Sequence, residues 1–204
     1  MMIIFTGFMQ GFAHVISGPD HMVALTPIAV KNAPSARYLG FMWGLGHGFG
    51  SILIGGIFVA FGLNEQSSFF SWSEVVVGLT LMCLGIWGIK NASNFSTSTA
   101  SALSLKPNIS MVTAFGVGAL HGLAGVSHLL LAVPALALTR MEAASYLVAY
   151  FLAAILAMFL FGIFLEKISL RSNYRLMRNL MLFVSLLTFV VGLIWVIQKW
   201  PLAW

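Results

Sequence analysis

The sequence predicts an all-α polytopic membrane protein with six transmembrane helices arranged as a 3+3 inverted-topology repeat. Of its 204 residues, 60% are hydrophobic and 7% are charged, which leaves too little polar surface for a soluble globule. The apolar residues gather in six stretches, each long enough to cross a bilayer. A glycine, histidine and proline motif in the first stretch recurs in the fourth, 107 residues later.

The six spans are bounded by charges or turn signals. The first and fourth are longer than the roughly 20 residues that a straight helix needs, so we expect them to be tilted or broken at their glycines. The first span has no Lys or Arg ahead of it and carries one copy of the motif, so we expect it to be retained and not cleaved as a signal peptide. The predicted spans are residues 3–30, 36–62, 71–91, 110–138, 141–165 and 177–199.

The chain divides into two three-helix units, at 1–92 and 110–204, within one membrane domain. A flexible cytoplasmic linker at 93–109 joins them, because this stretch is polar and low in complexity. The motif reads GFAHVISGPDHMVALTP at 11–27 and GALHGLAGVSHLLLAVP at 118–134. The ends of the third and sixth spans, LGIWGIK and VGLIWVIQK, are also similar. Because three is odd, the second unit enters the membrane from the opposite side, which makes the repeat inverted.

The basic residues predict the orientation of the chain. The loops after spans one, three and five hold eight Lys and Arg residues, and the other face holds Arg140 and Lys199. The positive-inside rule therefore places the eight-charge face in the cytoplasm and both termini outside, and we expect a bacterial cytoplasmic (inner) membrane. On the outer face, Glu65, Glu74 and Glu142 predict a mildly acidic mouth.

Tryptophans toward the ends of apolar stretches are expected at the membrane interface, where the indole N–H meets headgroups. These are Trp43, Trp72, Trp87, Trp195, Trp200 and Trp204.

All five histidines lie inside apolar stretches, where burial of an imidazole costs free energy. We therefore expect these side chains to have a function. The predicted depths of His14, His47 and His121 place these three side chains together near the middle of the membrane, with His21 and His128 as flanking sites two helical turns from their partners. Asp20 lies in the same span as His14 and His21, and a divalent cation would compensate its charge. The fourth span has Ser127 at the position aligned with Asp20. The predicted metal site is His14, Asp20, His21, His47, His121 and His128.

Imidazoles with one carboxylate and backbone oxygens suit first-row ions such as nickel, cobalt, zinc or iron, and suit calcium or magnesium poorly. The one cysteine, Cys83, offers no thiolate pair. A site without thiolates fits an ion that must leave again, so we expect a transported ion and no tightly bound cofactor. Pro19 is expected to break the first span and to leave a helix N-terminus at Asp20. The glycines around His47, in GLGHGFG at 44–50, fit either a functional site or close helix packing.

The chain resembles the nickel/cobalt transporter superfamily, and within it the short, UreH-like branch of urease and hydrogenase accessory membrane proteins. The resemblance rests on HVISGPDH at 14–21, WGLGH at 43–47 and HGLAGVSH at 121–128. The larger permeases of the superfamily have four residues between the first His and the Asp-His pair, and eight spans, whereas this chain has five residues and six spans. The resemblance implies nickel or cobalt transport, with His14, Asp20 and His21 in selectivity and permeation.

The expected function is secondary transport, or facilitated diffusion, of a divalent transition metal, with nickel ranked before cobalt. No nucleotide-binding motif is present, so the chain is not expected to be an ATP-driven pump by itself. The basic residues lie in loops between spans and are explained by membrane topology, so nucleic acid is not an expected partner. The expected partners are the metal ion and membrane lipid, and a homo-oligomer stays open. The alternatives are a bis-histidine haem electron-transfer protein, a membrane-embedded metal enzyme, and a metal exporter with the same ligands.

Overall fold

A computed structural model describes residues 1–61, 68–93, 111–123 and 138–200. Within these ranges the chain forms helices joined by short turns, and no strand occurs there, so the predicted all-α class is confirmed for this part of the chain. The elements are α1 (Met2–Ser17), α2 (Pro19–Lys31), the 3-10 helix η1 (Ala33–Ser35), α3 (Ala36–Phe61), α4 (Ser68–Ser93), α6 (Met111–Leu123), α8 (Arg140–Arg171) and α9 (Tyr174–Lys199).

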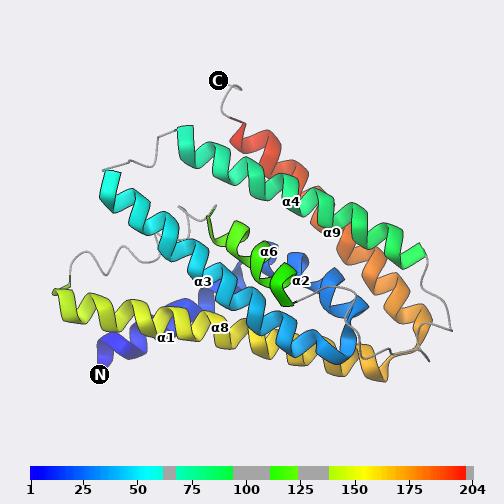
Figure 1. Ribbon diagram of the computed structural model, residues 1–204. Helices are drawn as coiled ribbons and strands as arrows, with labels where there is room; N and C mark the ends of the chain where they lie inside the picture. The colour runs from blue at the N-terminus through cyan, green and yellow to red at the C-terminus, as the bar shows by residue number, and fades with distance from the viewer. Residues whose placement is uncertain (62–67, 94–110, 124–137, 201–204) are drawn as a thin grey trace.

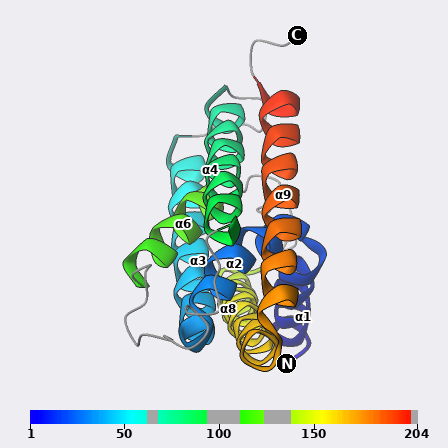
Figure 2. The same ribbon diagram turned by 90° about the vertical axis from the view of Figure 1, so that its right-hand side faces the viewer.

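Two groups of helices pack on either side of the short helix α2, and the short helix α6 lies against α3 at the edge of the bundle. Helices α4 and α9 pack along each other as one pair, and α3 packs against α8, which in turn packs against α1 (Figure 1). The short helix α2 contacts members of both groups, and α6 runs along α3 and also touches α4 (Figure 2). The interior of the bundle is therefore formed around α2, and α6 lies at its edge against α3 (Figure 2). The first copy of the repeated motif lies in α1 and α2, and the described part of the second copy lies in α6.

Among the described residues, three helices are long and apolar enough to cross a membrane, against the six predicted spans. Their spanning segments are Trp72–Ala92, Met141–Arg171 and Arg175–Gln198. Side chains exposed on α9 include Phe183, Leu186 and Ile197, which suit a lipid environment. The structure therefore agrees with a membrane protein. The predicted linker at 93–109 lies outside the described residues, apart from Ser93.

The first predicted span is broken in the middle, as expected. Helix α1 ends at Ser17, Gly18 has extended backbone angles (φ −87°, ψ 95°), and α2 starts at Pro19. Proline suits the first position of a helix because it has no N–H to leave unpaired there. The Gly18 N–H donates to the carbonyl of His14, which closes the end of α1. The break separates α1 from a second helix whose first turn carries Asp20.

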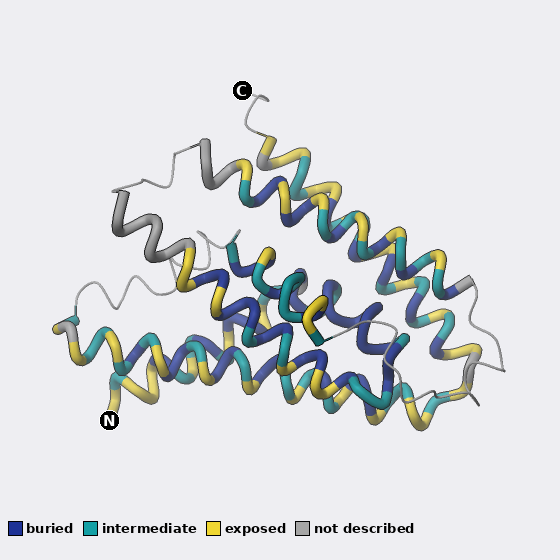
Figure 3. Tube along the Cα trace, in the orientation of Figure 1, coloured by how far each residue is buried: buried dark blue, intermediate teal, exposed yellow. Residues whose placement is uncertain are grey.

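Helix α2 is buried along most of its length (Figure 3). Pro27 lies inside this helix, where it removes the hydrogen bond that the carbonyl of Val23 would otherwise accept. The hydroxyl of Thr188 on α9 lies 2.8 Å from that carbonyl oxygen and 2.8 Å from the carbonyl oxygen of Val184, one turn back on α9, so its one proton serves both acceptors. A side chain of the second half therefore satisfies a backbone group that proline leaves open in the first half.

Glycines allow α3 and α6 to approach closely. Cβ atoms on Gly46 or Gly50 would collide with carbonyl oxygens of α6, and Cβ atoms on Gly118 or Gly122 would collide with carbonyl oxygens of α3. The hydroxyl of Ser51 lies 3.5 Å from the carbonyl oxygen of Gly122 in the same interface. The glycines around His47 thus have a packing role, one of the two readings that the sequence left open.

Helices α2, α4 and α8 end, and α3 and α9 begin, at one end of the bundle, where the described basic helix ends lie (Figure 1). Lys31 donates to the side chain of Asn91, and its ammonium lies 4.9 Å from the centre of the Trp87 ring. Arg37 forms a two-pronged ion pair with Glu166, in which its Nε lies 2.8 Å from Oε2. These contacts join α2 to α4 and α3 to α8 at this end of the bundle.

Candidate metal centre

Five ligand-type side chains meet in the interior of the bundle, from four different helices. His14 lies near the end of α1, Asp20 and His21 lie in the first turn of α2, His47 lies in the middle of α3, and His121 lies near the end of α6. All five are buried, and none exposes more than 5% of its surface. Ionisable side chains are costly to bury among apolar helices, so their gathering marks this place as the candidate site.

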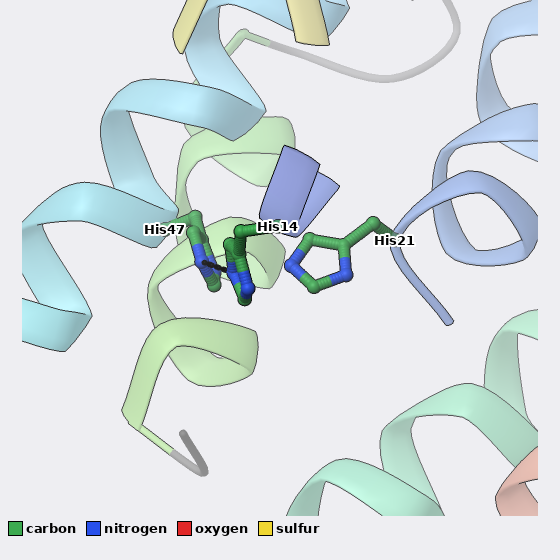
Figure 4. A group of neighbouring side chains, drawn as sticks. All are labelled: His14, His21 and His47. Carbon is green, nitrogen blue, oxygen red and sulfur yellow. Dashed lines mark hydrogen bonds between the residues drawn. The ribbon is translucent and has the colours of Figure 1, made fainter. Parts of the chain in front are cut away.

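The ligand atoms lie at short distances from one another. Nε2 of His14 is 3.5 Å from Nε2 of His47, and Nε2 of His121 is 2.8 Å from Oδ2 of Asp20. The other carboxylate oxygen of Asp20 is 3.3 Å from Nδ1 of His21. The ring of His21 lies 4.7 Å from that of His14 and 4.9 Å from that of His47, between centres (Figure 4).

These atoms form two groups that could each hold a metal ion. One group is His14, His21 and His47, and the other is Asp20, His21 and His121; within each group the ligand atoms lie within 4.8 Å of one another. Two nitrogens bound about 2.1 Å from one tetrahedral ion are about 3.4 Å apart, close to the His14 to His47 separation. The described donors are imidazole and carboxylate, the set that nickel, cobalt and zinc accept.

The helix break places Asp20 where backbone dipoles favour a negative charge. The carboxylate lies in the first turn of α2, and unpaired N–H groups at a helix N-terminus carry partial positive charge. The break also turns the chain between His14 and His21, and their rings meet nearly edge to face, with an interplanar angle of 87°. The Gly18-Pro19 break thus both stabilises the acid and folds two histidines toward each other.

The structure brings together five of the six predicted site residues. His128 lies outside the described residues, as do Ser127 and Pro134. His14, His47 and His121 converge as expected. The expectation that His21 only flanks the site is wrong, because the break at Gly18 turns α2 inward and places the His21 ring among the other three. The role of these residues as metal ligands stays a prediction.

Trp43 is a site residue that sequence reasoning misplaced. It was expected at the membrane interface, yet it is fully buried, because it lies two turns inside α3 and not at its end. Its ring stacks on His47 at 5.4 Å with an interplanar angle of 11°, and it lies 5.1 Å from the ring of His121. Its place four residues before His47, one turn along the same helix, was the signal that could have identified it.

Tyr150 on α8 is a second aromatic neighbour that the sequence analysis did not single out. Its ring lies 5.7 Å from that of His14, and the residue is 5% exposed. Tyr150 is 107 residues after Trp43, the spacing of the repeated motif. That spacing was the available signal. Each of the two aligned histidines, His14 and His121, therefore has an aromatic ring beside it.

The described residues do not form the predicted acidic mouth. Glu74 is buried within α4, which begins at Ser68, several residues before the predicted span. Glu142 lies in the first turn of α8 and forms a capping box with Thr139, with its Oε2 2.7 Å from the hydroxyl. Glu65 lies outside the described residues. The two described carboxylates therefore belong to helix packing and capping, and form no open acidic cluster.

The described part of the chain is thus a bundle of membrane-type helices around a buried histidine and aspartate cluster. Sequence comparison places three curated proteins beside it. Chloroplast protein FOR GROWTH AND FERTILITY 2 of Arabidopsis thaliana is 33% identical over 177 residues, 80% of this chain and 47% of its own length. Chloroplast protein FOR GROWTH AND FERTILITY 1 of the same plant is 31% identical over 175 residues, 75% of this chain and 46% of its own length.

The third similar protein is the urease accessory protein UreH of Bacillus sp. (strain TB-90), which is 29% identical over 140 residues, 63% of this chain and 60% of its own length. This similarity supports a partial relationship to the urease accessory and nickel transporter family. The chain spans about half the length of the two chloroplast relatives. No protein-family model matches the chain, and no solved structure matches it significantly.

Proposed function

We propose that this chain is a membrane transporter of divalent transition-metal ions, with nickel as the first candidate and cobalt as the second. One observation carries the proposal: four histidines and an aspartate from four helices meet at a helix break inside a bundle of apolar helices. Broken helices at the centre of the membrane are the usual place for substrate sites in transporters. The similarity to UreH and the three histidine motifs support a metal substrate.

The proposed fold is a 3+3 inverted repeat in which residues 107 positions apart are counterparts. The contacts between α1 and α8 match those between the counterpart helices α6 and α3, and this match supports the arrangement. Gly11 packs against the carbonyl of Tyr150, and their counterparts Gly118 and Trp43 make the same contact. A two-fold relation between the halves requires such an exchange, whereas chance resemblance between apolar helices does not.

Two further sets of contacts obey the same exchange. Gly78 on α4 packs against Gly192 on α9, and their counterparts Ser185 and Gly85 also pack against each other. Between α3 and α8, Gly44 adjoins Ile155, and the counterparts Phe151 and Gly48 are also neighbours. Contacts of this kind at three different helix interfaces support the repeat well beyond the five identities of the motif.

In the proposed topology, the end of the bundle with Lys31, Arg37 and the start of α9 faces the cytoplasm, and both termini lie outside a bacterial cytoplasmic membrane. A negative-inside potential then favours entry of the ion by about 2.3 kcal/mol per charge for each 100 mV. The proposed protein is a facilitator or secondary transporter. Asp20 is the one carboxylate in the described cluster, so an ion bound by it would leave no second acid there as a general base for water attack.

Haem binding fits the site poorly. Two axial histidines need a porphyrin plane between or beside their rings, and the rings of Trp43, His21 and His121 already surround His47 at 4.9 to 5.9 Å. The space that a porphyrin would need is filled by side chains. A purified protein without a Soret band is the outcome that we expect.

The decisive experiment is metal uptake into proteoliposomes that contain a metal-sensitive dye, with an imposed negative-inside potential. Nickel, cobalt, zinc and manganese are compared for the wild type, His14→Ala and Asp20→Ala. We expect nickel and cobalt entry that both variants lose, while size-exclusion profiles and helical circular dichroism stay unchanged. Wild-type uptake in both variants, or no flux in the wild type, would contradict the proposal. Metal flux in the export direction only would identify an exporter.

A further inference from the structure

The ring of His21 lies between the two ligand groups and belongs to both. Its Nδ1 lies 3.3 Å from Asp20, on the side where the second carboxylate oxygen meets His121. Figure 4 shows the other ring nitrogen, Nε2, directed toward His14 and His47. The same imidazole therefore offers one nitrogen to each group.

One ion cannot use both nitrogens of a single imidazole. Their lone pairs lie in the ring plane and point in diverging directions, so an ion at Nε2 is out of reach of Nδ1. The separation of 3.5 Å between His14 and His47, and that of 2.8 Å between Asp20 and His121, each suit two ligands of one ion. The geometry thus contains two small sites and not one large site.

Charge argues against filling both sites together. Ions on opposite nitrogens of one ring would repel each other, and repulsion is strong in a buried site with a low effective dielectric constant. Asp20 is the one carboxylate in the described cluster. One negative charge can compensate one divalent ion only in part, and a second ion would add two further positive charges.

We infer that His21 is a shared ligand that divides the cluster into two mutually exclusive stations for one divalent ion; this inference rests on the proposed transport function. In the first station the ion is bound by His14, His47 and Nε2 of His21. In the second it is bound by Asp20, His121 and Nδ1 of His21. Passage from first to second breaks the bond to Nε2 and forms one to Nδ1. One proton leaves Nδ1 and one is taken up at Nε2, so the ring stays neutral.

The division explains why a carrier would use ligands of two kinds. An ion in the first station has three neutral imidazoles, whereas one in the second station has a carboxylate. Two neighbouring stations with comparable affinity let an ion bind and still move on, whereas one site of very high affinity would retain it. His21 links the stations because it never has to leave the ion's neighbourhood.

The test uses cobalt(II) and nickel(II) binding to the purified full chain in detergent, with equilibrium dialysis for stoichiometry and cobalt absorption spectra for ligand type. We expect one ion per chain in the wild type. His14→Ala and His47→Ala weaken only the first station, so the cobalt ion moves to the second. Both variants should then give the same absorption spectrum, that of an ion bound by a carboxylate and two imidazoles. Asp20→Asn and His121→Ala weaken only the second station, and both should give the absorption spectrum of an ion bound by three imidazoles. His21→Ala loses binding at least tenfold more than any of these four.

Each station has two variants, so the test survives if one variant fails to fold, and size-exclusion chromatography monitors this. Identical affinities and spectra in all four variants would show one undivided site and overturn the inference. Two ions per wild-type chain would overturn mutual exclusion, and no binding to the wild type would overturn the stations altogether. Two spectral classes without uptake in proteoliposomes would instead contradict the transport proposal and leave the stations standing.

Discussion

The first and second halves of the chain contribute equally to the scaffold and unequally to the site. Helix α3 packs along α6 much as α8 packs along α1, and α4 pairs with α9. Yet residues 1–92 supply His14, Asp20, His21 and His47, while the described part of residues 110–204 supplies His121. At the positions aligned with Asp20 and His47, the second half has Ser127 and Ala154. Packing between helices and the proposed binding of an ion therefore place separate requirements on the same architecture.

The largest expected effect comes from replacing Asp20 in the first half by serine, the residue at the aligned position of the second half. In Asp20→Ser, the chain carries serine at both aligned positions, so the ion loses its compensating charge. Breaking a buried charge interaction costs about 3 to 5 kcal/mol, so we expect nickel uptake in proteoliposomes to fall by at least about 100-fold. Asp20→Glu, which keeps the charge, is the matched control. Equal uptake by Asp20→Ser and wild type would show that the asymmetry of charge has no role.

A glycine pair tests the equality of the scaffolds. Gly118→Ala places a methyl group against the Trp43 carbonyl, and overpacking of this kind costs about 3 kcal/mol. The counterpart Gly11→Ala meets the Tyr150 carbonyl in the same way, so we expect a similar loss of thermal stability.

The control for both is Gly116→Ala, because a Cβ there meets no described atom within 4 Å. Alanine favours a helix over glycine by up to about 1 kcal/mol, so this variant should melt at or slightly above the wild-type temperature. A large loss in Gly116→Ala, or none in the other two, would contradict the close approach of these helices.

Thr188→Val tests how the second half supports the helix that carries Asp20 and His21. Valine keeps the shape but leaves the Val23 carbonyl without the donor that Pro27 makes necessary. An unsatisfied buried acceptor costs about 1 to 3 kcal/mol. We expect a lower unfolding temperature in detergent with nickel uptake retained, and Thr188→Ser, which keeps the hydroxyl, should restore most of the stability. An unchanged unfolding temperature in Thr188→Val would mean that this bond contributes nothing.

Replacing Trp43 by the residue type of its counterpart, Tyr150, is expected to have the smallest effect. Trp43→Tyr gives the first half the residue that the second half has at position 150, and a ring remains beside His47 and His121. Ring pairs contribute about 0.5 to 1.5 kcal/mol, so we expect nickel affinity to fall about three- to tenfold. The indole N–H of Trp43 has no hydrogen-bond partner among the described residues, so the ring itself is expected to matter. Trp43→Phe should behave like Trp43→Tyr, and a much larger loss in either would assign the indole a direct role.

The helical class, the break in the first span and the gathering of His14, His47 and His121 followed from the sequence. Span boundaries were less accurate because they were placed at charges. Helix α8 continues to Arg171, beyond the predicted end at 165, since Glu166 remains helical and pairs with Arg37. The central place of His21 and the burial of Trp43 depend on how α2 turns at Gly18 and how closely α3 approaches α6. Periodicity along one chain contains no information on such turns between elements.

The burial of α2 has a consequence for biosynthesis. With 13 residues it is about 20 Å long, too short to cross a hydrocarbon core of about 30 Å, and it contains an acid, a histidine and an internal proline. A translocon would not release such a segment into lipid by itself. It settles only among partners, and one of these, Thr188, lies near the end of the chain. We therefore expect the cluster around Asp20 to be completed only after the ribosome has made the last helix, so that a nascent chain halted before α9 would insert without a finished cluster.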